Sequence, residues 1–340
     1  MGFKRLDAED FVVSADAVQS TAWSTGQPIL SQFFTSSVQL ASSAGSFYLS
    51  VYQEDVTGAS ASSATVQFDI TYGNVNGLGS EYYNGAVPSL TPSRTVYGQY
   101  RTLVLEDENT NFTYGTDNNV FTPNDFWALS VERARYKEKL FPGTFNLTLS
   151  GSGGLLNLTD NSNDVTYQTF IGSNRVLQIV SGSNGSAIAA NSGYAPGSGS
   201  YGLFLPDIGT ILLNPAALSE SINLVPDRTA DLTNGTNQVT LYTAISGGGA
   251  FELNSQETIT SDYIFVRSRN SEFNYSENPS FISGSTGEII YDEFINNPQV
   301  YITTVGMYND ANELIAVAKM SKPLLKDFTK ESLVRVKLDF

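Results

Sequence analysis

Apolar residues at every second position are the feature of this sequence that most limits its fold. The alternation recurs at residues 47–52, 64–72, 145–149, 239–245 and 334–340. Such alternation puts apolar side chains on one face of an extended chain and is typical of half-buried strands. We therefore expect an all-β protein of antiparallel sandwich-like or barrel-like domains, with long loops and one or two short helices.

Turn signals separate these stretches. Asn-Gly dipeptides begin at Asn76, Asn84, Asn184 and Asn234, and this pair supplies the positive φ angles that tight hairpin turns require. Residues 181–202 are rich in Gly and Ser, which predicts a long exposed loop.

Helix signals are few. Residues 214–220 begin with Asn followed by Pro, an N-cap with proline in the first turn, so we expect a short helix there. Residues 122–125 carry a similar signal. The following run, 126–134, is compatible with helix or strand, and we favour strand.

The length of 340 residues suggests two domains or one large β-domain with extensions. We expect an N-terminal arm at 1–30, a β-domain at 31–143 and a second β-domain at 144–340 that carries a C-terminal hairpin. The Gly/Ser-rich stretches near 151–154 and 181–202 are equally compatible with loops inside one fold, so the boundary stays open.

Composition excludes several classes of function. The chain has no Cys and no His, which excludes disulfides, thiolate nucleophiles, the Ser-His-Asp triad and His-ligated metals. The 34 Asp and Glu against 18 Lys and Arg give a net charge of -16, which disfavours a phosphate backbone as partner. The apolar runs are too short for a membrane span and no secretory signal is apparent. We expect no nucleic-acid or membrane partner, and a protein that is assembled in the cytoplasm and not secreted.

Two motifs resemble ligand-binding sites, but the residues around them do not fit such sites. Residues 197–202 match G-x-G-x-x-G, but strand-like residues and Pro206 follow where a dinucleotide site needs a helix. Asp160, Ser162 and Asp164 have the spacing of a calcium loop but lack its Gly and its final Glu. A polar turn is therefore the favoured interpretation, although a weak calcium site stays open.

Paired carboxylates are the catalytic chemistry that the composition still allows. With 34 acidic residues, no pair stands out. We therefore expect no catalytic residue, no cofactor and no resident metal.

Basic residues gather in two places. Arg133, Arg135, Lys137 and Lys139 fall within seven residues, and the last 40 residues hold six more basic residues. Solvated strand faces are the ordinary explanation. The alternative is that two basic stripes meet acidic surfaces on neighbouring subunits.

The C-terminal region is the most specific part of the sequence. It reads Pro298-Gln-Val-Tyr-Ile-Thr-Thr-Val-Gly-Met-Tyr308, followed by Asn-Asp-Ala-Asn-Glu-Leu-Ile-Ala-Val-Ala-Lys319. This pattern predicts a strand, a turn of four or five residues from Asn309, and a returning strand from Leu314. The stretch resembles a hairpin module that recurs in virion structural proteins of tailed bacteriophages. Residues 132–143 and 269–279 look like parts of the same kind of protein, and the similarity is greatest to contractile-tailed phages of marine cyanobacteria.

The resemblance implies a non-enzymatic structural subunit of a tailed-phage virion, in the tail baseplate or the fibre-attachment region. Its expected partners are other virion structural proteins and copies of itself, in a symmetric oligomer or ring. Interface residues are expected at Arg133, Arg135, Tyr301, Met307 and Tyr308, with ordinary core or solvated surface as the alternative for each.

Two other functions stay open. One is a receptor-binding or decoration protein whose exposed aromatic residues bind host surface glycans. The other is a glycan depolymerase that uses two carboxylates.

Overall fold

The computed structural model describes residues 4–54, 64–81, 91–116, 118–233, 235–276 and 278–339. Strand makes up 41% of the structure and helix 18%, and the described strands pair antiparallel. The largest sheet forms a half-barrel. The all-β prediction is therefore confirmed.

The chain divides into two compact units. The larger unit is Val18–Glu257, and the smaller unit combines Met1–Ala17 with Thr258–Phe340. The predicted boundary at 143 lies inside the larger unit, because strands on both sides of it belong to one sheet. The predicted arm at 1–30 is divided between the two units. Residues 1–17 belong to the smaller unit and residues 18–30 to the larger.

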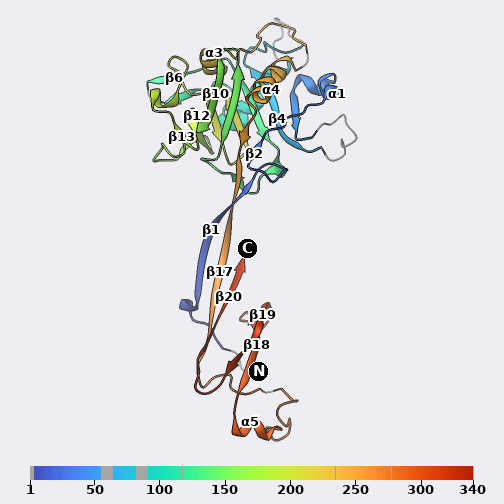
Figure 1. The fold of residues 1–340 in the computed structure, drawn as a ribbon, viewed down its shortest axis with the longest axis vertical. Helices are drawn as coiled ribbons and strands as arrows, with labels where there is room; N and C mark the ends of the chain where they lie inside the picture. The colour runs from blue at the N-terminus through green and yellow to red at the C-terminus, as the bar shows by residue number, and fades with distance from the viewer. Residues whose placement is uncertain are drawn as a thin grey trace. The chain divides into compact units, whose positions relative to one another are not determined.

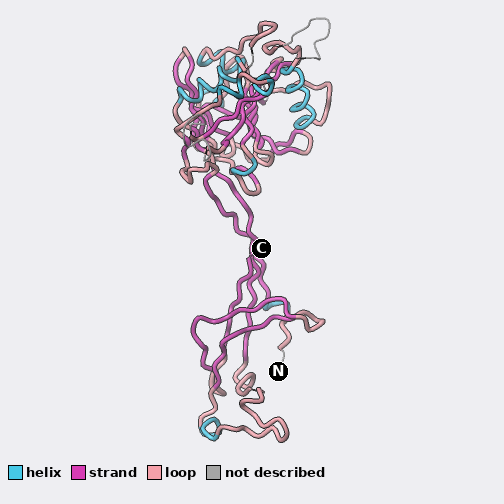
Figure 2. Tube along the Cα trace, turned by 90° about the vertical axis from the view of Figure 1, so that its right-hand side faces the viewer, coloured by secondary structure: helices cyan, strands magenta, loops and turns pink. Residues whose placement is uncertain are grey.

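A twelve-stranded sheet forms the larger unit among the described residues (Figures 1 and 2). The strands along its main path are, in spatial order, β2 (Ile29–Leu30), β16 (Phe251–Glu252), β9 (Asn146–Gly151), β10 (Gly154–Asp160), β12 (Asn174–Ser183), β14 (Gly202–Leu205), β15 (Thr210–Leu213), β7 (Asp125–Val131), β4 (Val66–Asn74) and β3 (Tyr48–Tyr52). Two further strands, β11 (Thr169–Ile171) and β13 (Ser186–Ala187), pair with β12.

Both faces of the central strands are covered. On one face, α3 (Pro215–Ile222) and α4 (Thr236–Gly248) contribute to the main hydrophobic cluster. On the other face, α2 (Pro92–Leu105) packs in a second cluster. Trp127 of β7 belongs to the first cluster and its neighbour Phe126 to the second, as expected for a strand that alternates between two buried faces.

Several local predictions are confirmed. The strands predicted at 47–52, 64–72, 145–149 and 334–340 correspond to β3, β4, β9 and β20 (Ser332–Asp339), with Phe340 outside the described residues. The ambiguous run at 126–134 contains strand β7, and no helix follows the cap-like signal at 122–125. In α3, Asn214 accepts a hydrogen bond from the Ala216 amide at 3.1 Å, as predicted.

The strand predicted at 239–245 is wrong. These residues lie in α4, where Leu241, Ala244 and Ile245 are buried against the sheet. The spacing i, i+3, i+4 of these three residues fits a helix, just as the alternation over 239–245 fits a strand. Packing against β9 selects the helix. The 14-residue helix α2 was not predicted, although Thr91-Pro92 is a start signal of the same kind as Asn214-Pro215.

The turn predictions had mixed outcomes. Asn184 (φ 52°) and Gly185 (φ 75°) form the two-residue turn between β12 and β13, as Asn-Gly pairs do. The long exposed loop predicted at 181–202 is wrong in part, because this segment includes β13 and the buried residues Ala195, Ser200 and Tyr201. Asn84 and Asn234 lie outside the described residues.

The remaining short elements of the larger unit are α1 (Ser37–Leu40), β5 (Tyr114–Thr116), β6 (Asn119–Phe121), β8 (Lys139–Leu140) and the 3-10 turns at 43–46, 133–135 and 190–193.

The smaller unit contains two sheets. Strands β1 (Phe11–Thr21), β17 (Asn254–Ser268) and β20 lie in the order β1-β17-β20, and β18 (Val300–Tyr308) pairs with β19 (Leu314–Lys326). Figure 1 shows β17 and β20 side by side. The boundary between the units falls inside β1 and β17. A short helix, α5 (Asp292–Asn296), and a 3-10 turn at 8–10 complete this unit.

Candidate functional site

The predicted C-terminal hairpin is present. The Glu313 amide donates to Asn309 Oδ1 at 2.8 Å, and Asn309 Nδ2 donates to Glu313 Oε2 at 2.8 Å. These bonds close a turn between Tyr308 and Leu314, where Asn312 adopts a positive φ of 59°. The turn at 309–312 and the returning strand from Leu314 are therefore confirmed.

One face of this hairpin lies on the core of the smaller unit. Met307 lies opposite Ala316 in the register, and Met307 packs with Ile264 and Val336. At 7% exposure, Met307 is a core residue of its own chain.

The other face is apolar and exposed near the turn. Gly306 lies opposite Val317 and Tyr308 opposite Leu314, and a Cβ added at Gly306 would come within 3.1 Å of the Tyr308 ring. We call the exposed residues Tyr308, Leu314, Ile315 and Val317 the hairpin patch. Their exposed fractions are 41%, 54%, 68% and 58%. Tyr301, at the other end of β18, is 61% exposed.

Apolar exposure extends over the rest of the smaller unit. The described side chains that share this exposure are Phe11, Val12, Val13, Phe273, Tyr275, Ile290, Tyr291, Ile295, Phe328 and Leu333. Of these, Phe11, Val12 and Val13 lie in the predicted N-terminal arm at 1–30.

Arg133 and Arg135 lie in the larger unit, so they belong to a different unit from the three predicted hairpin residues. The Arg133 guanidinium lies 4.5 Å from the centre of the Tyr136 ring and donates to the Tyr136 carbonyl at 2.5 Å. Arg135 Nε is shielded from solvent and has no hydrogen-bond partner among the described residues. Nearby, Lys137 pairs with Glu257 at 3.4 Å.

The C-terminal basic residues have varied surroundings. Lys337 pairs with Asp339 at 2.8 Å and Lys330 with Asp327 at 3.6 Å, while Arg335 stacks on Tyr263. Lys326 is fully buried. These residues therefore do not form one continuous solvated stripe.

Two buried carboxylates have structural partners. Asp125 accepts from Arg228 Nε at 2.7 Å and from the Tyr72 hydroxyl at 2.8 Å. Asp160 accepts from the amides of Ser162 and Gly143 at 2.9 and 2.8 Å. The pKa of Asp160 is raised overall, because the effect of burial exceeds the lowering effect of its hydrogen bonds.

The predicted polar turn at 160–164 is confirmed. Besides the bonds to Asp160, the Asp164 carboxylate accepts from the Ala187 amide at 2.6 Å. No group of three or more acidic residues suited to a metal ion occurs in the described ranges.

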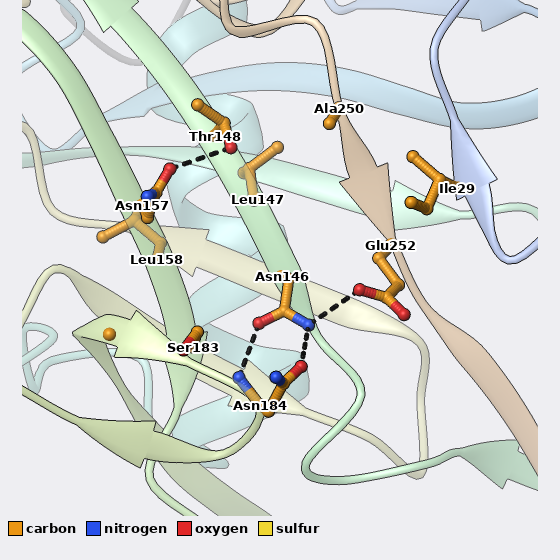
Figure 3. Close-up of a pocket in the computed structure, with 11 residues that line it drawn as sticks. Ile29, Asn146, Leu147, Thr148, Asn157, Leu158, Ser183, Asn184, Ala250 and Glu252 are labelled. Atoms are coloured by element: carbon orange, nitrogen blue, oxygen red, sulfur yellow. Dashed lines mark hydrogen bonds between the residues drawn. The ribbon is translucent and has the colours of Figure 1, made fainter.

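A shallow pocket of about 280 Å³ opens on the sheet where β9, β10 and β16 meet (Figure 3). Its polar groups bond to one another. Asn146 Nδ2 donates to Asn184 Oδ1 at 2.9 Å and to Glu252 Oε2 at 3.0 Å, and Thr148 donates to Asn157 at 3.0 Å. No aromatic ring lines this pocket among the described residues, so it lacks the stacking surface that sugar sites commonly use.

A second pocket, of about 320 Å³, lies between α2 and strands β3, β4 and β7. Aromatic side chains and the Asp69 carboxyl line it. The sequence did not single out Asp69, because its pocket is assembled from four separate segments.

Comparison with known proteins identifies no relative. No family model, no curated protein and no solved structure matches the chain. Among the described residues, no helix is long and apolar enough to cross a membrane.

Proposed function

We propose that this chain is a non-enzymatic structural subunit of a tailed-phage virion, placed in the tail baseplate or the fibre-attachment region. It acts through protein–protein interfaces with copies of itself and with other virion proteins. The resemblance of residues 298–319 to the phage hairpin module supports the assignment to a virion.

The smaller unit exposes more large apolar side chains than it buries, and this observation supports a role in assembly. In the described residues, the larger unit buries 46 hydrophobic side chains and exposes 13 large ones, whereas the smaller unit buries three and exposes fifteen. The core of the smaller unit is therefore small, with three buried hydrophobic side chains and a few partly buried ones packed on them among its described residues, and we infer that a partner covers part of its exposed apolar surface.

The summed exposed area of these side chains is comparable with one side of a standard interface. The fifteen side chains expose on the order of 1,000 Å², if each exposes roughly half of about 150 Å². A standard interface buries about 800 Å² per partner.

Both units carry a net negative charge. Residues 1–17 and 258–340 contain 10 of the 18 basic and 15 of the 34 acidic residues. The smaller unit thus carries a net charge of 10 − 15 = -5, and the larger unit 8 − 19 = -11. Over the 100 residues of the smaller unit and the 240 of the larger, these net charges amount to a similar charge per residue, so repulsion does not distinguish the two units and the apolar surface alone favours the smaller one.

Light scattering of the full chain across a concentration series tests this proposal. We expect a species well above 36.7 kDa. The double substitution Ile315→Glu and Val317→Glu in the hairpin patch should lower the mass, because charge opposes burial of that face. The control Tyr167→Glu changes a residue of the larger unit that is 84% exposed and should leave the mass unchanged. A wild-type monomer at all concentrations would contradict self-association.

The virion assignment needs its own test. Mass spectrometry of purified virus particles that encode this sequence should detect the chain at a fixed ratio to known tail proteins. Its absence from particles, together with accumulation in infected cells, would contradict a structural role.

A further inference from the structure

A polar row crosses the sheet beneath the second pocket. Strand register places Ser50 opposite Asp69, Asp69 opposite Ser130, and Ser130 opposite Thr210. Directly opposed residues of antiparallel strands point to the same face, so these four side chains form one row across β3, β4, β7 and β15. Ala128, which lies two residues before Ser130 on β7, faces the apolar cluster under α2. The polar row therefore lies beside the apolar cluster on the same face of the sheet.

Aromatic side chains surround the part of the row that α2 leaves open. Phe47 and Tyr48 line the pocket and are each 39% exposed. From the side of α2, Tyr100 also lines the pocket, and its hydroxyl lies 2.6 Å from Ser130 Oγ. The pocket thus offers ring faces beside a polar floor.

Two acceptors at this floor lack partners. Oδ1 of Asp69 and Oγ1 of Thr71 are shielded from solvent and have no hydrogen-bond partner within the described part of the chain. Both residues line the pocket, and Thr71 is only 9% exposed. Buried polar atoms are almost always paired in native proteins, so this floor is short of hydrogen-bond donors. The Asp69 side chain as a whole is only partly buried and lines the pocket, where a donor can approach its carboxylate.

A positively charged group complements this floor. Of the described residues that line the pocket, none is basic, and Asp69 takes part in none of the ion pairs found among the described residues. Burial raises the pKa of Asp69, the Ser50 hydroxyl lowers it, and the nearby Glu132 carboxylate raises it further. A cation would relieve this unfavourable burial of charge.

We propose that this pocket binds a guanidinium group, presented as an arginine side chain of a partner protein. A guanidinium carries five N–H donors for the Asp69 carboxylate and the neighbouring hydroxyls, and its flat face stacks on aromatic rings such as that of Tyr48. A volume of about 320 Å³ accommodates one such group. This site is additional to assembly through the smaller unit and does not depend on it.

Saturation-transfer NMR on the full chain tests the proposal with small probes. Ethylguanidinium is the probe, and N-ethylurea is its uncharged isostere. We expect saturation transfer to ethylguanidinium and at least tenfold weaker binding of the urea, because hydrogen bonds between charged groups are about twice as strong as neutral ones.

Variants assign the binding to the pocket. Asp69→Asn should weaken ethylguanidinium binding about tenfold or more, which corresponds to about 1.4 kcal/mol. Tyr48→Leu should weaken it through loss of the ring face. Glu108→Gln removes an exposed acidic residue of the same unit and should leave binding unchanged.

Three outcomes would overturn the proposal. They are equal binding of the urea and guanidinium probes, equal effects of Asp69→Asn and Glu108→Gln, and no saturation transfer at all. Transfer to methyl α-glucoside without transfer to ethylguanidinium would also overturn it and assign the pocket to a sugar.

Discussion

The buried ammonium group of Lys326 donates a hydrogen bond to Oδ1 of Asn274 at 2.8 Å. It also donates to the carbonyls of Asn270 and Asp327, each at 3.0 Å. Lys326 is 0% exposed and Asn274 is 1% exposed. Because a lysine is almost never fully buried without partners, this cluster fastens the segment 270–274 to the end of β19.

Replacing Asn274 should loosen the smaller unit alone. Asn274→Ala leaves a buried cation with one acceptor fewer, at a cost of about 1–3 kcal/mol. Hydrogen exchange should rise in peptides that cover 270–274 and β19. Tryptophan emission should stay unchanged, because both tryptophans, Trp23 and Trp127, are buried in the larger unit. The control Asn296→Ala, at an exposed position, should change neither signal, and equal exchange in the two variants would refute this role.

Two glycines in helices should respond to alanine in opposite directions. A Cβ at Gly248 of α4 would lie 1.9 Å from the Thr148 carbonyl oxygen of β9, whereas a Cβ at Gly98 of α2 meets nothing within 4 Å. Gly248→Ala should therefore lower the Tm, since helix and strand must separate, at about 1–3 kcal/mol. Gly98→Ala should raise the Tm by reducing backbone freedom in the unfolded chain, by about 0.5–1 kcal/mol. Thermal unfolding followed by circular dichroism measures both, and the same sign in both variants would contradict the packing of α4 on β9.

The charge of Asp69 should make stability depend on pH. Burial raises its pKa in the folded protein above the usual value of 3.8. Its protonated form therefore stabilises the fold below about pH 4, and this contribution is lost as pH rises through the raised pKa. Asp69→Asn should have a higher Tm than wild type at pH 7, with the gain shrinking towards pH 4. A gain that stays constant over this range would show that ionisation of Asp69 is not its cause.

The larger unit should fold without the smaller one. A fragment of residues 18–257 keeps the twelve-stranded sheet and its two hydrophobic clusters. It should unfold cooperatively and remain monomeric by light scattering at concentrations where the full chain associates, because the exposed apolar surface is concentrated in the smaller unit. A fragment that associates as strongly as the full chain would move the interface into the larger unit.

The sequence by itself determined the strands with strict alternation and the turns with special residues. Residues 64–72 and 145–149 follow period 2, and each became a strand with its apolar residues in the core. The hairpin between Asn309 and Leu314 was predictable for the same reason, since Asn309 and Glu313 satisfy the turn locally. Local chemistry is enough wherever one backbone conformation alone fits the pattern.

Tertiary structure decided the rest. Residues 239–245 fit both a strand and a helix, and only packing against β9 selected the helix. The sequence did not reveal the division into two units. An alternating strand has the same pattern whether its apolar face is buried by the same chain or exposed to solvent, as in the hairpin patch. The pocket at Asp69 exists because strand register brings Tyr48, Asp69 and Ser130 together from three strands. Such placement depends on contacts between distant segments, and no pattern within one segment carries that information.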